Sequence, residues 1–173
     1  GRDVEISIEE RPLPDSKWVD RIRYVNVGGR KLRSIFRYSK TGEPGYDIEH
    51  LVKEPEDLKA LLKVKYEPFT IDINSYNEAI AKIGDRGVVI FDIDHAAYAV
   101  SRIMGSECFA LMCIDERELI REAVETYAAR IREHVKVILA TDIKPIFGWV
   151  GPELCIPPLV REKDFEEFVY DID

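Results

Sequence analysis

The chain has 173 residues, of which 46% are hydrophobic and 34% are charged, and its formal net charge is -8. This length supports one domain with a hydrophobic core. The acidic balance argues against a nucleic-acid partner, because a phosphate backbone attracts a basic surface. No apolar stretch reaches the length of a membrane helix, and three sparse cysteines do not make a disulfide framework. We therefore expect a cytoplasmic protein with no membrane partner.

The first part of the chain has the pattern of β-structure. Apolar and polar side chains alternate in residues 4–8, which is the period of a half-buried strand. Two further β-rich runs lie on either side of Gly28-Gly29, which predicts a hairpin. We assign residues 1–52 to a β-rich meander. It would cover one end of the core or, alternatively, act as a flap over a substrate.

Residues 53–173 change to a mixed helical and extended pattern. Pro55, followed by two acids, predicts a helix start. Ser75, with Glu78 three residues later, predicts the capping box of a second helix. A continuous apolar run at residues 88–91 is typical of a strand that is buried on both faces.

The second half of this part continues with helices. Residues 96–104 predict a helix that ends at Gly105, and Asp115, with Glu118, predicts the cap of a long helix running to about residue 139. The apolar stripe of that helix is interpreted as core rather than as a cofactor contact; it consists of Leu119, Ala123, Tyr127, Ile131, Val135 and Ile138. A strand at Ile146–Val150 and a last helix at residues 164–169 follow. The alternation of strands and helices predicts parallel strands.

Candidate functional residues follow the two predicted strands. They are Asp92, Asp94 and His95 after the first strand, and Trp149, Gly151 and Glu153 at the end of the second. In α/β folds ligands bind beyond the carboxyl ends of the strands. A carboxylate beside an imidazole could act as general acid and base. Two structural alternatives stay open: Asp94 could cap the next helix, and Glu153 could lie solvated in a turn.

No metal site is predicted within the chain. Cys108 and Cys113 are five residues apart, which does not place them on one helical face, and no Cys-x-x-Cys occurs. The chain also has no phosphate-binding loop and no nucleophile elbow. A local basic patch at residues 30–33 is interpreted as a solvated strand edge, with contact to an anion as the alternative.

Several segments resemble the uroporphyrinogen decarboxylase superfamily. Residues 54–58 are similar to its acidic Asp-Leu helix start, and residues 103–109 are similar to its Leu-Met-Gly-x-Glu-x-Phe segment. Residues 151–159 and 164–168 resemble the Gly-Pro-Glu…Pro-Pro…Phe-x-Glu-Phe segment of its less characterised, corrinoid-methyltransferase-related branch. The likeness runs in order over most of the chain.

The resemblance implies the fold and the chemistry. The expected fold class is α/β: part of a TIM-like (β/α)8 barrel with a β-rich N-terminal meander, truncated at both ends. Family members include the decarboxylase of haem synthesis, a lyase that needs no cofactor, and zinc-dependent methyltransferases that act on corrinoid proteins. The substrate would therefore be a small molecule or a corrinoid protein. Zinc ligands or corrinoid contacts would lie beyond Asp173, with no cofactor held within this chain.

Two departures from the family pattern favour the methyltransfer-related branch. The active-site tyrosine of the decarboxylase falls on Ser101, with Tyr98 one turn earlier, and its Asp-Asp-x-Gly-x-Gln-like strand end is replaced by residues 149–153. We expect the catalytic residues to be Asp92, Asp94, His95 and Glu153, and the substrate-binding residues to be Tyr98, Ser101, Trp149 and Gly151. The alternative is a catalytically inactive fragment or a non-catalytic binding or dimerisation domain, which would form a homodimer.

Overall fold

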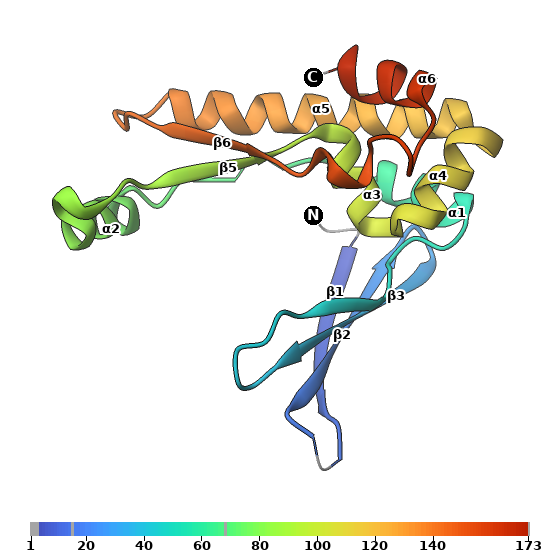
Figure 1. Ribbon diagram of the computed structural model, residues 1–173, viewed down its shortest axis with the longest axis horizontal. Helices are drawn as coiled ribbons and strands as arrows, with labels where there is room; N and C mark the ends of the chain where they lie inside the picture. The colour runs from blue at the N-terminus through green and yellow to red at the C-terminus, as the bar shows by residue number, and fades with distance from the viewer. Residues whose placement is uncertain (1–3, 15, 68, 173) are drawn as a thin grey trace. The chain divides into compact units, whose positions relative to one another are not determined.

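The computed structural model describes residues 4–14, 16–67 and 69–172, which belong to two compact units (Figure 1). Unit 1 comprises Gly1–Lys65 and Ser101–Ile120, and unit 2 comprises Tyr66–Val100 and Arg121–Asp173. The strands are β1 (Val4–Pro12), β2 (Trp18–Val27), β3 (Arg30–Ser39), β4 (Tyr46–Glu49), β5 (Ile90–Asp94) and β6 (Ile146–Val150). The helices are α1 (Pro55–Leu62), α2 (Ile73–Ile83), α3 (Ala96–Met104), α4 (Ser106–Asp115), α5 (Arg117–Leu139) and α6 (Glu162–Phe165), with the short turns η1 (Gly84–Arg86), η2 (Pro152–Leu154) and η3 (Glu166–Tyr170).

The N-terminal strands form an antiparallel sheet in the order β1-β2-β3-β4. The connection between β2 and β3 is the two-residue turn Gly28-Gly29, in which both residues have positive φ values, 54° and 78°. A two-residue turn with positive φ at both positions matches the twist of the flanking strands, and glycine adopts these φ values at little cost. The β-rich meander and its hairpin are therefore confirmed.

The predicted TIM-like (β/α)8 barrel is wrong. Of the six described strands, four pair antiparallel, and only β5 and β6 pair in parallel. The connections between successive strands from β1 to β4 are short. Short connections join antiparallel neighbours, whereas each parallel pairing of a barrel needs a helical crossover. The fold is a mixed α/β arrangement with a four-stranded antiparallel sheet and one parallel pair.

Strand β5 also differs from the predicted strand at residues 88–91. It begins at Ile90 and ends at Asp94, so two of the predicted catalytic acids lie within the strand rather than after it. It is not buried on both faces, since Val88 and Ile90 are 57% and 50% exposed. Phe91 is half-buried and stacks on Tyr76, with ring centroids 5.6 Å apart. A strand covered on one face alternates in sequence, as this one does.

Two helices begin at other residues than the predicted caps. Helix α2 begins at Ile73, and its cap is Asp72, whose carboxylate accepts from the backbone N–H of Ser75 at 3.1 Å. Aspartate at this position binds an N–H that has no partner inside the helix. Asp115 ends α4 instead of capping α5.

Within the described ranges, no helix is by itself both long and apolar enough to cross a membrane, and α3 with α4 meets that criterion only as a bent pair.

Unit 1 has its core where the β2–β3 hairpin meets α1. The buried residues of this cluster are Val25, Val27, Leu32, Leu51 and Ala60. In unit 2, Ala123, Val124, Ala128 and Ile138 of α5 are buried, which confirms the long amphipathic helix. Arg121 of α5 forms an ion pair with Glu167 and lies over the ring of Phe168, 6.0 Å from its centroid. The C-terminal turn is thereby fixed against α5.

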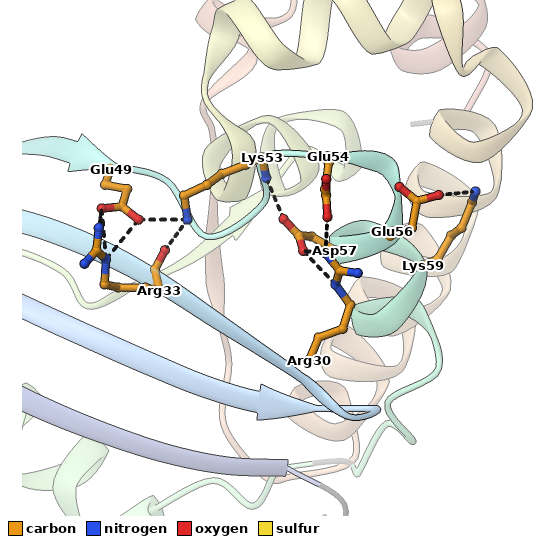
Figure 2. Close-up of polar contacts among 8 residues, drawn as sticks. All are labelled: Arg30, Arg33, Glu49, Lys53, Glu54, Glu56, Asp57 and Lys59. Atoms are coloured by element: carbon orange, nitrogen blue, oxygen red, sulfur yellow. Dashed lines mark hydrogen bonds and ion pairs between the residues drawn. The ribbon is translucent and has the colours of Figure 1, made fainter.

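Charged side chains tie β3 and β4 to α1, as Figure 2 shows. Arg33 donates to Glu49 with an Nη2–Oε2 distance of 2.6 Å, and Arg30 donates through Nε to Asp57 Oδ1 at 2.9 Å and through Nη2 to Glu54. Asp57 also accepts from the backbone N–H of Lys53 at 3.0 Å. Arginines 30 and 33 of the basic patch are therefore neutralised by acids of the same unit.

Removing the Asp57 carboxylate is expected to destabilise unit 1. Asp57 is only 5% exposed, so Asp57→Ala leaves Arg30 and the Lys53 N–H without their buried acceptor. We expect a loss of about 3 kcal/mol in the free energy of unfolding, measured by urea titration. The matched control is Glu56→Ala, which removes an exposed pair with Lys59 at 3.3 Å and is expected to change stability by less than about 0.5 kcal/mol. Equal losses for the two variants would contradict this assignment.

The buried Asp20 predicts a loss of stability in acid. Hydrogen bonds from Arg37, with Nε 2.7 Å from Oδ1, hold the pKa of Asp20 below its usual 3.8, and Arg11 lies 3.5 Å away. Because the folded-state pKa lies below the unfolded-state value, the stabilisation is complete above about pH 4 and is lost as the pH falls through the folded-state pKa. Urea titrations above and below about pH 4 should show that the free energy of unfolding depends less on pH in Asp20→Asn than in the wild type. A variant with the wild-type slope would show that Asp20 does not contribute.

Candidate functional site at the carboxyl ends of β5 and β6

The parallel pairing of β5 and β6 brings the predicted residues after each strand close together. The register runs from Ile90 opposite Ile146 to Asp94 opposite Val150, so the carboxyl ends of both strands lie at one edge. His95 follows β5 directly, and its ring stacks on Trp149 of β6 with centroids 5.0 Å apart and an interplanar angle of 19°. Residues from two separate predicted groups are therefore neighbours within unit 2.

A cavity of about 500 Å³ opens beside this strand pair. Its walls are mainly apolar and include Ile93, Ile131, Val135, Phe147 and Trp149. Three ionisable side chains also line it: Asp94 from the end of β5, and Arg132 and Lys136 from α5. Lys136 forms an exposed ion pair with Glu133 at 2.7 Å, so its ammonium group remains accessible to solvent. The cavity combines an apolar surface with two cations and one carboxyl group, a composition usual for small-molecule sites.

Tyr98 and Gly151 pack against each other rather than standing apart as two substrate contacts. Gly151 is buried with φ +100°, and a Cβ atom there would lie 2.2 Å from the Tyr98 ring atoms Cδ1 and Cε1. Only glycine leaves room for the ring and adopts this backbone conformation at little cost. The contact fixes the segment after β6 against the first turn of α3, next to His95.

Of the eight predicted residues, only Asp94 and Trp149 line the cavity, and three of the others also lie apart from the His95 and Tyr98 contacts. Asp92 is exposed and lies beside Gly148, where a Cβ atom would be 3.1 Å from the Asp92 Oδ1 atom. Glu153 is exposed within η2. Ser101 is fully buried and belongs to unit 1. Of the eight predicted residues, the structure therefore groups Asp94, His95, Tyr98, Trp149 and Gly151, and places the other three elsewhere.

Helix α5 contributes two cavity residues that are not among the residues predicted from the sequence. Arg132 and Lys136 are spaced four apart, each directly after a member of the apolar stripe, Ile131 or Val135, so both pairs lie on one side of the helix. We interpreted that stripe as core alone, but Ile131 and Val135 are half-buried and line the cavity. The signal in the sequence that could have indicated these site residues was the pair of basic residues, Arg132 and Lys136, beside the apolar stripe.

No zinc site is evident among the side chains described. In residues 4–14, 16–67 and 69–172, no group of three or more His, Cys, Asp and Glu side chains is placed to hold a metal ion. His134 lies 3.8 Å from Phe69 between ring centroids, and burial lowers its pKa. Comparisons of the chain with models of protein families, with curated proteins and with solved structures found no match.

Proposed function

We propose that the protein is an enzyme that acts on a small organic acid bound in the cavity beside β5 and β6. The observation that carries the proposal is the convergence of Asp94, Arg132 and Lys136 on one mainly apolar cavity. The chemistry would be of the uroporphyrinogen decarboxylase-like kind, either decarboxylation or methyl transfer linked to a corrinoid protein. The sequence resemblance supports this choice of reactions. None of the cysteines forms a disulfide in the part of the chain that the structure describes, which also supports a cytoplasmic location.

The cavity offers what a decarboxylation needs. A substrate carboxylate would bind to Arg132 and Lys136, while the reacting carboxylate lies against the apolar wall, which disfavours its charge. The carbon–carbon bond to this group breaks, carbon dioxide leaves, and the electron pair stays on the substrate carbon. Asp94 would pass a proton from water to that carbon. Trp149, stacked on His95, would form part of the apolar wall against which the substrate lies.

The size of the cavity supports a small substrate for methyl transfer as well. A volume of about 500 Å³ suits a drug-sized molecule and would hold a tetrapyrrole only in part. A corrinoid would then remain on its own protein, and the cavity would bind the small acid that accepts the methyl group from it. The side chains described do not fit a zinc ion, so no step is assigned to zinc.

Two assays test the proposal. Uroporphyrinogen is followed for carbon dioxide release. Methylcobalamin, mixed with a small thiol acid as methyl acceptor, is followed for loss of its methyl group to the sulfur, which leaves cob(I)alamin and changes the visible absorption. We expect one reaction to proceed and to fall at least tenfold in Arg132→Ala, because a hydrogen bond to a charged group contributes about 1.5–3 kcal/mol. The control is Lys82→Ala on α2, outside the cavity, which should keep full activity. Absence of both reactions in the folded protein would contradict the proposal.

A non-catalytic binding or dimerisation domain is the second candidate. Ile90 and Ile146 are register partners and are 50% and 48% exposed. Parallel strands are usually covered on both faces, so this apolar pair favours a second copy as its cover. Light scattering should then show a dimer that Ile90→Lys converts to monomer, while Ile6→Lys in unit 1 has no effect. A monomer at every concentration would exclude this candidate.

A further inference from the structure

Strand β1 is a long and unprotected edge of the antiparallel sheet in unit 1. Its nine residues pair with β2 in one continuous register, and no strand in the part of the chain that the structure describes pairs with its outer side. Such an edge can pair with another chain, and proteins usually block it with a short strand, a bulge or a lysine. The opposite edge is blocked in this way, since β4 has four residues and a register shift lies beside it. Strand β1 has no register shift and no lysine.

The hydrogen bonds to β2 determine which backbone groups of β1 face outward. The N–H of Leu13 donates to the carbonyl oxygen of Trp18 at 3.0 Å, and bonded and non-bonded pairs alternate along an antiparallel ladder. Counting back in steps of two from Leu13 along the continuous register gives the residues that bond to β2: Arg11, Glu9, Ser7 and Glu5. The residues between them point their N–H and C=O groups away from β2: Val4, Ile6, Ile8 and Glu10. This outward row stops at Pro12, which has no N–H.

The side chains in the middle of β1 are apolar on one face and acidic on the other. Ile6 and Ile8 are 53% and 62% exposed, and they share a face with the core of unit 1, because the register partner of Ile6 is the buried Val25. Glu5 and Glu9 project from the other face, and their register partners on β2 carry no charge. Side chains of an added strand lie beside those of the edge strand. The edge therefore matches a segment that is apolar on one face and basic on the other.

We propose that the edge of β1 binds an extended segment of a partner protein in which basic and apolar residues alternate. The segment adds a strand to the sheet: its backbone bonds to Ile6 and Ile8, and its apolar side chains cover both isoleucines. Its basic side chains lie beside Glu5 and Glu9, and the net charge of -8 also favours a basic partner. A second copy fits this edge less well, since two β1 strands would bring six glutamates together. This surface is independent of the function proposed for unit 2.

The probe is a fluorescein-labelled peptide of alternating lysine and valine, about seven residues long, which is a usual strand length. Its binding to the whole chain is followed by fluorescence polarisation, and amide hydrogen exchange of the protein is followed by NMR. We expect saturable binding. Exchange should slow at the outward amides of Ile6, Ile8 and Glu10 when the peptide binds. The amides of Ser7 and Glu9 should exchange slowly with or without the peptide, because they bond to β2.

Two variants of β1 and one matched control test the contacts. Glu9→Lys places a lysine beside the lysines of the peptide and should weaken binding about fivefold. The control is Glu78→Lys, which makes the same change of net charge at an exposed position of α2 in unit 2 and should leave the affinity unchanged. Ile8→Pro removes an outward N–H but no bond to β2, and it should abolish binding. Circular dichroism shows whether each variant is folded, and Glu9→Lys carries the test if Ile8→Pro is not.

A second peptide of the same composition, with its lysines first and its valines last, tests the alternation and should bind at least fivefold more weakly. The proposal is overturned if this peptide binds equally well, or if Glu78→Lys weakens binding as much as Glu9→Lys. It is overturned if the alternating peptide does not bind, or if it binds without slowing exchange at Ile6 and Ile8. Slow exchange at these amides before the peptide is added also overturns it, since a second copy or another segment would then already cover the edge.

Discussion

Gly151→Ala is expected to lower the free energy of unfolding of unit 2 by about 3 kcal/mol, as measured by urea titration. The new Cβ atom would lie 2.2 Å from the Tyr98 ring, so the ring or the backbone must move. Overpacking of this kind costs about 1–3 kcal/mol. The φ value of +100° adds about 1–2 kcal/mol for any residue with a Cβ atom.

Two further variants separate the clash from the backbone effect. Gly84 has φ +58° and open space around its Cα, so Gly84→Ala should show only the smaller backbone cost, about 1 kcal/mol. Combining Gly151→Ala with Tyr98→Ala should cost about 1–3 kcal/mol less than the sum of the two single changes, because the clash is absent. Strict additivity would show that the Tyr98–Gly151 contact does not hold the segment after β6.

Asp94→Asn is expected to lower the turnover number of the proposed decarboxylation about 10²–10⁴-fold. The amide has nearly the shape of the carboxyl group but cannot donate the proton. Binding of the substrate should change little, because Arg132 and Lys136 remain in the cavity. Steady-state kinetics of the folded variant therefore should show a fall in kcat with KM nearly unchanged.

Asp92→Asn is the matched control for this experiment. Asp92 lies two residues before Asp94 on the same strand, but it is exposed and does not line the cavity. We expect it to keep its activity within about twofold, as a surface change away from the site should. An equal loss of activity in both variants would indicate that Asp92 belongs to the site, as predicted from the sequence. It would contradict a site that is confined to the cavity.

The local pattern of the chain predicted much of its secondary structure. The hairpin at Gly28-Gly29, helices α1 and α3, the body of α5 and strand β6 all follow from period and turn residues, which are local properties. Strand β5 lies two residues later than predicted, because residues 88–91 form one continuous apolar run that also fits a strand. The alternation of Phe91 and Ile93 with Asp92 and Asp94 already indicated a strand covered on one face.

Strand pairing and the site needed information that the local pattern lacks. The barrel came from the family resemblance, whereas the observed pairing depends on contacts between segments far apart in sequence. The grouping of Asp94, His95 and Trp149 could be predicted, because parallel strands place their carboxyl ends at one edge. The spacing of the α5 cations beside the apolar stripe was a signal that they share one helix face, but the stripe alone does not say which strands that face meets.

The most direct test of the central claim uses the two tryptophans of the chain. Trp149 lines the proposed site in unit 2, and Trp18 lies on β2 in unit 1. The indole N–H signals of both are followed by NMR while an anilinonaphthalene sulfonate, an aromatic acid, is added. We expect a saturable shift of the Trp149 signal alone, with binding at least tenfold weaker in Arg132→Ala. A Trp149 signal that does not move, or that moves no more than the Trp18 signal, would contradict a ligand site beside β5 and β6.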